Sequence, residues 1–83
     1  MTNLEVYPNP TRDELNVSFV SEELQSISVS IVDAYGKEVF SQEDRQFIGE
    51  YTQKVNVNRF AKGVYFLQIV TDSNTLYERI IVQ

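Results

Sequence analysis

The side chains that most often carry out catalysis are missing from this 83-residue chain, which contains neither histidine nor cysteine. A Ser-His-Asp or Cys-His arrangement therefore cannot form, and the usual histidine and cysteine ligands of a zinc site are absent. Two adjacent carboxylate pairs, Glu22-Glu23 and Glu43-Asp44, remain as candidates for acid–base chemistry. We expect both pairs to lie on loops as solvated charge, and we predict that the domain is not an enzyme.

Carboxylates on loops are also the only candidates for holding a metal ion. Asp33 and Asp72 could offer oxygen ligands, but the sequence around them lacks the dense ligand spacing of a calcium loop. There is no glycine-rich phosphate loop, so the sequence predicts no cofactor. The formal net charge of −5 argues against a nucleic-acid partner, because such proteins present dense positive surface to the phosphates.

The elements that must position any functional side chain are strands, because apolar and polar residues alternate along most of the chain. The alternation predicts seven short strands, near residues 4–7, 14–19, 25–33, 38–42, 50–57, 64–71 and 75–82. Residues 21–24 have no apolar face following them, and we interpret them as a loop. Short strands at this spacing without a helix indicate an antiparallel β-sandwich or a small barrel, and we favour an immunoglobulin-like sandwich.

Glycine-containing turns separate several of these strands. In Asp33-Ala-Tyr-Gly-Lys37, we expect Gly36 to supply a positive φ and Asp33 to accept backbone N–H bonds across the bend. In the longer connection that ends at Gly63, glycine releases the chain into the next strand. We expect Tyr65 to lie in the core with its hydroxyl bonded at the rim.

Both prolines of the chain lie together, in Val6-Tyr-Pro-Asn-Pro-Thr11. Proline fixes its own φ and biases the preceding residue toward extended geometry, and it removes a backbone donor. This segment is therefore predicted to form a stiff corner between the first two strands. As structure, this interpretation is sufficient; a role in recognition is the alternative.

Four segments, taken in order, resemble one protein family. They are Val6-Tyr-Pro-Asn-Pro-Thr11; Val32-Asp-Ala-Tyr-Gly-Lys37 with Glu38-Val-Phe40; Phe60-Ala-Lys-Gly-Val-Tyr65; and Arg79-Ile-Ile-Val-Gln83. Together they are similar to the type A C-terminal sorting domain of the type IX secretion system of Bacteroidetes-type bacteria. The chain departs from the pattern at Phe60, where the family often has leucine, and at Arg79, where it often has lysine.

The resemblance implies a single β-domain, residues 1–83, at the C-terminus of a larger exported protein. It implies that the domain carries an N-terminal cargo from the periplasm through the outer-membrane translocon to the cell surface or the medium. It also implies that a sortase-like surface protease then removes the domain and that the cargo is attached to the surface. No apolar run approaches the ~20 residues of a membrane-spanning helix, and the N-terminus lacks the features of a signal peptide, so we expect a fragment of a longer protein.

Residues of the corner, the turns and the terminal strand are our candidates for recognition. They are Pro8, Asn9, Pro10, Asp33, Gly36, Lys37, Gly63, Tyr65, Arg79, Ile80, Ile81, Val82 and Gln83. In the terminal strand, Tyr77, Arg79 and Ile81 should lie on one side, with Ile80 and Val82 on the other. An apolar strand at an edge could add to a receptor sheet, or pair with a second copy to form a dimer.

The alternative function is an immunoglobulin-like or fibronectin-like accessory module that binds carbohydrate or protein. Exposed aromatic residues would support this function, and the candidates are Tyr35, Phe47 and Tyr51. Tryptophan, which sugar platforms often use, is absent.

Overall fold

Five strands form a single curled antiparallel sheet in the computed structural model, which describes residues 1–83. The strands are β1 (Thr2–Tyr7), β2 (Glu14–Asp33), β3 (Glu38–Asn56), β4 (Gly63–Thr71) and β5 (Thr75–Val82). β3 pairs with β2 along nearly its whole length, while β1 and β4 pair with the first and second halves of β2, and β5 pairs with β4. The all-β antiparallel prediction is confirmed, and no helix is present that could cross a bilayer.

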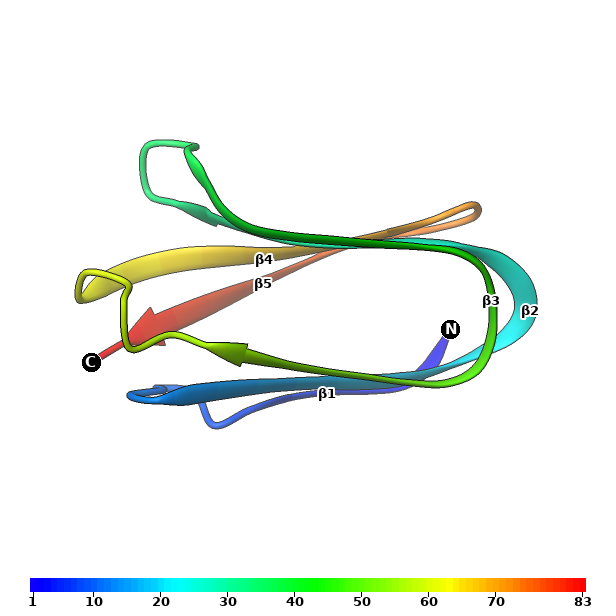
Figure 1. The fold of residues 1–83 in the computed structure, drawn as a ribbon, viewed down its shortest axis with the longest axis horizontal. Helices are drawn as coiled ribbons and strands as arrows, with labels where there is room; N and C mark the ends of the chain where they lie inside the picture. Colours follow the sequence, from blue (N-terminus) through cyan, green and yellow to red (C-terminus); the bar gives the residue numbers. More distant parts are fainter.

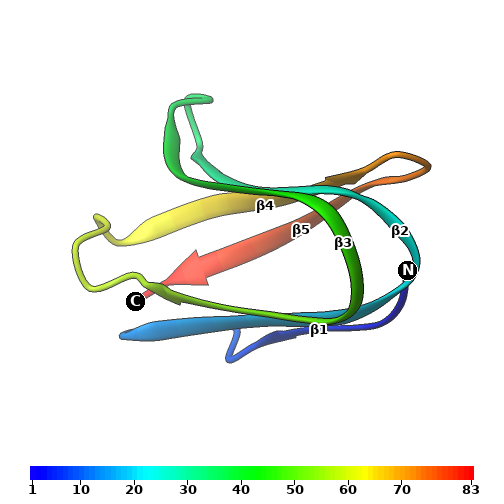
Figure 2. The same ribbon diagram turned by 45° about the vertical axis from the view of Figure 1, so that its right-hand side comes forward.

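The sheet curls because its two longest strands bend halfway along their length (Figures 1 and 2). The first half of β2 lies beside β1, and its second half lies in the opposing layer beside β4. Buried side chains occupy odd positions in both halves, from Leu15, Val17 and Phe19 to Ile27, Val29 and Ile31. The same face of β2 therefore points into the core in both halves and is apolar on either side of the bend, as a strand that folds over its own core requires.

The predicted count of about seven short strands is not confirmed, because two predicted pairs of strands are continuous. Residues 21–24, expected to be a loop, lie within β2, where the register with β3 shifts between Ser21 and Gln25. Ser21 and Gln25 point inward, and the Gln25 amide donates to the Ser21 hydroxyl at 2.9 Å. Polar residues that hydrogen-bond to each other inside a strand bend have the same sequence character as a loop. This is why residues 21–24 were wrongly predicted to be a loop.

β3 also bends, and here the inward-facing positions change from even to odd. Phe40 and Asp44 lie opposite Ile31 and Ile27, whereas Tyr51 lies opposite Phe19. Between the two halves, Gln46 has φ of 54° and Gly49 has φ of 103°, conformations typical of a β-bulge. The carboxylates Glu43 and Asp44 consequently lie in a strand and not on the predicted loop, and Glu22 and Glu23 likewise lie in β2.

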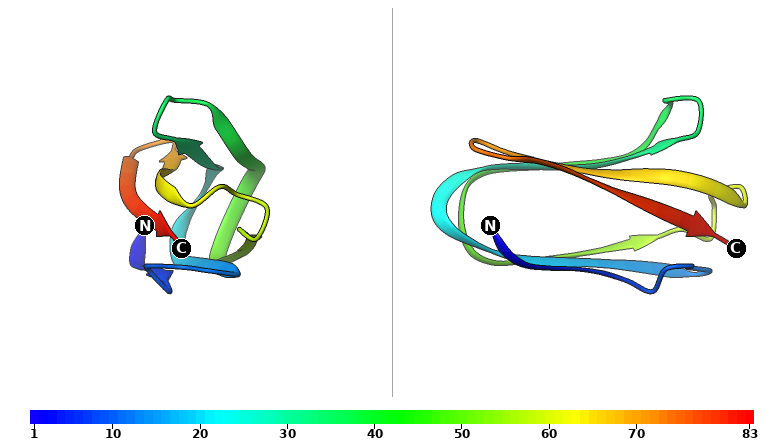
Figure 3. Two further views of the ribbon diagram at one scale, coloured as in Figure 1. Left: turned by 90° about the vertical axis from the view of Figure 1, so that its left-hand side faces the viewer. Right: turned by 180° about the vertical axis from the view of Figure 1, so that it is seen from behind.

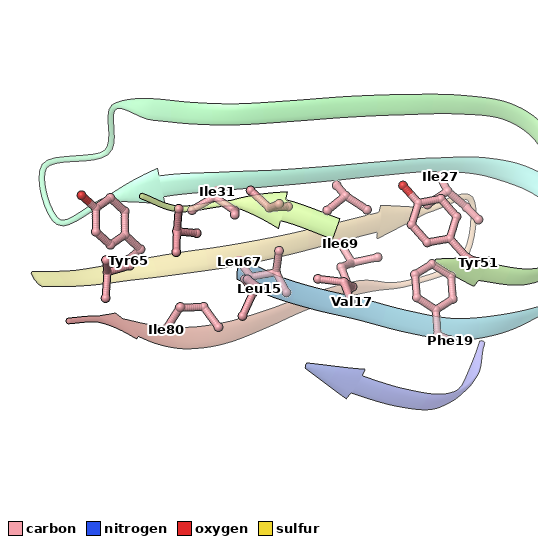
Figure 4. Packing of buried hydrophobic residues seen from close by; sticks show 14 residues of the cluster. Leu15, Val17, Phe19, Ile27, Ile31, Tyr51, Tyr65, Leu67, Ile69 and Ile80 are labelled. Atoms are coloured by element: carbon pink, nitrogen blue, oxygen red, sulfur yellow. The ribbon is translucent and has the colours of Figure 1, made fainter. Parts of the chain in front are cut away.

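A cluster of buried hydrophobic residues fills the space between the two facing layers (Figure 4). Its fourteen buried residues are Leu15, Val17, Phe19, Ile27, Val29, Ile31, Tyr51, Val55, Val57, Tyr65, Leu67, Ile69, Ile80 and Val82. At the bend, the rings of Phe19 and Tyr51 stack with centroids 4.8 Å apart. This pair joins the two long strands where they turn, so it stabilises the curl itself.

Alkaline pH is expected to weaken the fold through Tyr51. Burial of the Tyr51 hydroxyl and, to a lesser extent, the negative charge of Asp44 raise the pKa of Tyr51 from 10.0 to about 12. Ionisation of the Tyr51 phenol is therefore harder in the folded than in the unfolded chain, so the folded state loses stability as the pH rises from about 10 to 12. Thermal unfolding followed across this range should show the loss.

The matched controls for this prediction are Tyr51→Phe and Tyr77→Phe. Tyr51→Phe removes the ionising group, so its melting temperature should fall less steeply above pH 10 than that of the wild type. Tyr77 is 67% exposed, and its replacement should leave the steep fall unchanged. Equal pH dependence in wild type and Tyr51→Phe would contradict the assignment.

Candidate recognition site

The proline corner and the terminal strand, separated by about seventy residues of sequence, are bonded directly to each other. The Asn9 side chain donates from Nδ2 to the Arg79 carbonyl at 2.8 Å, and its Oδ1 accepts from the Ile81 N–H at 3.0 Å. The side-chain amide thus occupies the edge of β5 as a backbone peptide group of a neighbouring strand would. We call this pair of bonds the Asn9 bridge.

Thr11 extends the Asn9 bridge along the same edge. Its N–H donates to the Ile81 carbonyl and its carbonyl accepts from the Gln83 N–H, both at 2.8 Å, which gives a parallel bridge between Thr11 and Val82. Thr11 is 1% exposed, and its hydroxyl donates to the Glu14 carbonyl at 2.8 Å. Thr11 is not among the predicted recognition residues, although it ends the first of the segments that carry the family resemblance.

The terminal strand divides its side chains as predicted. Ile80 and Val82 are 1% and 4% exposed and pack in the core, whereas Arg79 and Gln83 are exposed and Ile81 is half-buried on the outer face. In the folded domain, Ile80 and Val82 are consequently inaccessible to a partner. Between Arg79 and Gln83 the strand edge is occupied by the Asn9 bridge and Thr11, so strand addition or dimerisation there would require the corner to move away.

Pro8, Asn9 and Pro10 are all exposed, and both X-Pro bonds of the corner are cis. Pro8 and Pro10, on either side of Asn9, have no backbone N–H, so neither leaves an unpaired donor in this exposed segment. Asn9 alone connects the corner to β5 by side-chain bonds, while the two prolines present apolar rings to solvent.

The turn between β2 and β3 has the predicted geometry. Gly36 has φ of 88°, and Asp33 Oδ1 accepts from the N–H groups of Tyr35 at 2.8 Å and Lys37 at 2.9 Å. The clamped turn holds Tyr35 outward, 96% exposed, with the Lys37 side chain free of any ion pair.

The connection from β3 to β4 is held by Tyr65. Its ring is 6% exposed, as expected of a core residue, and its hydroxyl donates to the Ala61 carbonyl at 2.6 Å. Phe60 packs on this ring with centroids 5.4 Å apart. Gly63, with φ of 149°, begins β4. Tyr65 therefore supports this turn from inside and offers little surface to a partner.

All four segments that carry the family resemblance come to one end of the molecule, which we call the motif end (Figure 1; Figure 3, left). We define it as residues 8–14, 33–38, 57–63 and 79–83. The register explains the gathering, since Glu14 lies opposite Asn56, Asp33 opposite Tyr65, and Gly63 opposite Val82. The β2 and β3 bends and the β4–β5 turn lie at the other end (Figure 3, right).

The remaining candidate residues do not assemble into a site. Asp33 lies at the motif end, whereas Asp72 lies at the opposite end, where its Oδ2 accepts from the Ser26 N–H at 3.4 Å. No three carboxylates are close enough together to hold a metal ion. Of the three aromatic candidates for an accessory module, Tyr35 is 96% exposed, whereas Tyr51 is buried and Phe47 is half-buried, with its ring edge-on to that of Tyr51 and the centroids 5.3 Å apart.

Comparison with known proteins gives the family. The model of the "Secretion system C-terminal sorting domain" family matches residues 5–83. An endo-acting ulvan lyase from Formosa agariphila is 30% identical over 78 residues, which are 94% of this chain and 14% of the lyase's length. The chain thus spans about a seventh of that relative. A match over almost the whole chain shows that it belongs to the secretion-system C-terminal sorting domain family, which indicates a type IX secretion sorting signal.

Proposed function

We propose that residues 1–83 form a noncatalytic domain at the C-terminus of a larger protein, and that the secretion machinery reads this domain through the motif end. Family membership implies export to the cell surface or the extracellular space, with a secretion-system partner and an N-terminal cargo. The observation that carries the proposal is the Asn9 bridge, because it joins two of the family segments into one rigid surface.

The surface proposed for contact consists of the exposed residues of the motif end. Among the predicted recognition residues these are Pro8, Asn9, Pro10, Gly36, Lys37, Gly63, Arg79 and Gln83, with Asp33 and Ile81 half-buried. Tyr65, Ile80 and Val82 act indirectly, because they are buried and hold the turns and the terminal strand in place. Recognition in this form reads a folded surface, and it needs no free strand edge.

The test is export of a reporter. A monomeric fluorescent or enzymatic reporter, preceded by a cleavable signal peptide and followed by residues 1–83, should reach the cell surface or the medium in a bacterium with type IX secretion. The reporter without the domain, and the fusion in a strain lacking the translocon, should remain in the periplasm. Retention of the complete fusion in the competent strain would overturn the proposal.

We also propose that the domain is removed after transit and that the cargo is then attached to the surface. Residues 2–82 lie almost entirely in paired strands and short turns, and folded strands are poor protease substrates. The cut is therefore expected before Thr2. Mass spectrometry of the exported reporter should find it without residues 2–83, and a surface-bound fraction should carry additional mass; an intact exported fusion would exclude removal.

A further inference from the structure

Cationic side chains are concentrated at the motif end. It holds Arg12, Lys37, Arg59, Lys62 and Arg79, which are five of the seven lysines and arginines, together with four side-chain carboxylates, for a net side-chain charge of +1. The rest of the chain has two cationic side chains and eight carboxylates, a net charge of −6. With a longest dimension of 36 Å, the domain is an electrostatic dipole along its long axis.

None of these five cations is used by the fold. The ion pairs of the structure are those of the Met1 amino group with Glu22 at 3.8 Å and of Arg45 with Glu43 at 3.6 Å, both outside the motif end. No hydrogen bond involves the side chain of any of the five. Arg12 and Lys62, from different turns, line one open hollow beside Gln83. The fold thus brings together unpaired cations that it does not need for its own stability.

We propose that the motif end docks end-on against an acidic surface of a partner protein, with Arg12, Lys62 and Arg79 as its cationic contacts. This inference rests on the proposed function and names the chemistry of its receptor. An acidic partner attracts the motif end and repels the carboxylates of the opposite end, so the charge distribution selects one orientation during encounter.

The pattern of charge favours a protein over a membrane surface. Asp13, Glu14 and Glu38 lie among the cations, so a uniformly anionic bilayer would attract the motif end only weakly. Such a bilayer would also repel the domain as a whole, because its net charge is −5. A protein can place individual carboxylates opposite individual cations. Tyr35, which also lies at the motif end and is 96% exposed on its clamped turn, adds the kind of aromatic anchor that protein interfaces use.

The experiment compares two variants of the reporter fusion that have the same net charge. Arg12→Gln with Lys62→Gln removes two cations from the motif end, and Arg45→Glu makes the same change of two units at the opposite bend. We expect the export rate to fall roughly tenfold in the first variant and to stay within about twofold in the second. The melting temperature of the isolated Arg12→Gln with Lys62→Gln domain should match the wild type, since neither side chain makes a hydrogen bond or an ion pair. Arg45→Glu loses only the exposed ion pair with Glu43, so its melting temperature should change little.

Each outcome has a separate meaning. If the wild-type fusion is not exported, the proposed function fails; if it is exported and both variants are exported equally, only this inference fails. Binding of the purified domain to vesicles of phosphatidylglycerol and phosphatidylcholine is the second measurement. Strong vesicle binding that Arg12→Gln with Lys62→Gln abolishes would assign the cations to a membrane and overturn the inference, whereas no binding together with the export defect supports it.

Discussion

Deletion of Ile80–Gln83 is expected to unfold the domain, so export should be lost because the signal loses its structure. The deletion removes the core side chains of Ile80 and Val82 and the acceptor and donor groups that hold Thr11. Burial of two such aliphatic side chains contributes several kcal/mol, a large share of the stability of a domain this small. Circular dichroism and chemical denaturation of the shortened domain should show no cooperative transition at 25 °C.

Single substitutions in β5 separate the core from the surface. Ile80→Ala leaves a cavity between the layers and should cost about 2–5 kcal/mol. Ile81→Ala is the matched control on the next residue; its side chain is half-buried on the outer face, so the cost should stay below about 1 kcal/mol. Equal costs for the two variants, or cooperative unfolding of the deletion variant, would contradict the assignment of β5 as a core strand.

Period-two alternation was sufficient to predict an antiparallel all-β domain and the ends of β4 and β5. It could not show that β2 and β3 each pass through both layers. The bends are made by inward polar residues such as Ser21 and Gln25 and by the positive φ of Gln46 and Gly49. A polar bend within a strand and a loop between two strands have the same local sequence, and they differ only in their pairing with a distant strand.

The candidate site shows the same division between local and distant information. The turn at Asp33 follows from local chemistry, because the carboxylate bonds N–H groups two and four residues ahead. The Asn9 bridge connects residues 70 and 72 positions apart, and nothing in either segment predicts the other as its partner. The sequence identified both the proline corner and the terminal strand as candidate recognition segments. The fold shows that the two segments are bonded to each other through Asn9.

Replacement of Asn9 by alanine is expected to weaken both folding and export. The substitution leaves the Ile81 N–H and the Arg79 carbonyl without their partner, and we expect a cost of about 1–3 kcal/mol. Asn9→Asp retains an acceptor for the Ile81 N–H but places a second oxygen opposite the Arg79 carbonyl. At neutral pH this variant should also be less stable than the wild type, and the difference should narrow as the carboxyl is protonated near pH 4.

Asn58→Ala is the matched control, because Asn58 lies at the same end and its side chain makes no hydrogen bond; its unfolding free energy should stay close to that of the wild type. Export measured at a temperature where all variants are fully folded then separates stability from recognition. If Asn9→Ala is folded but poorly exported there, the corner contributes surface as well as a structural bond. Wild-type stability in Asn9→Ala would mean that Thr11 alone holds the corner against β5, and that the Asn9 bridge is not what joins the two segments.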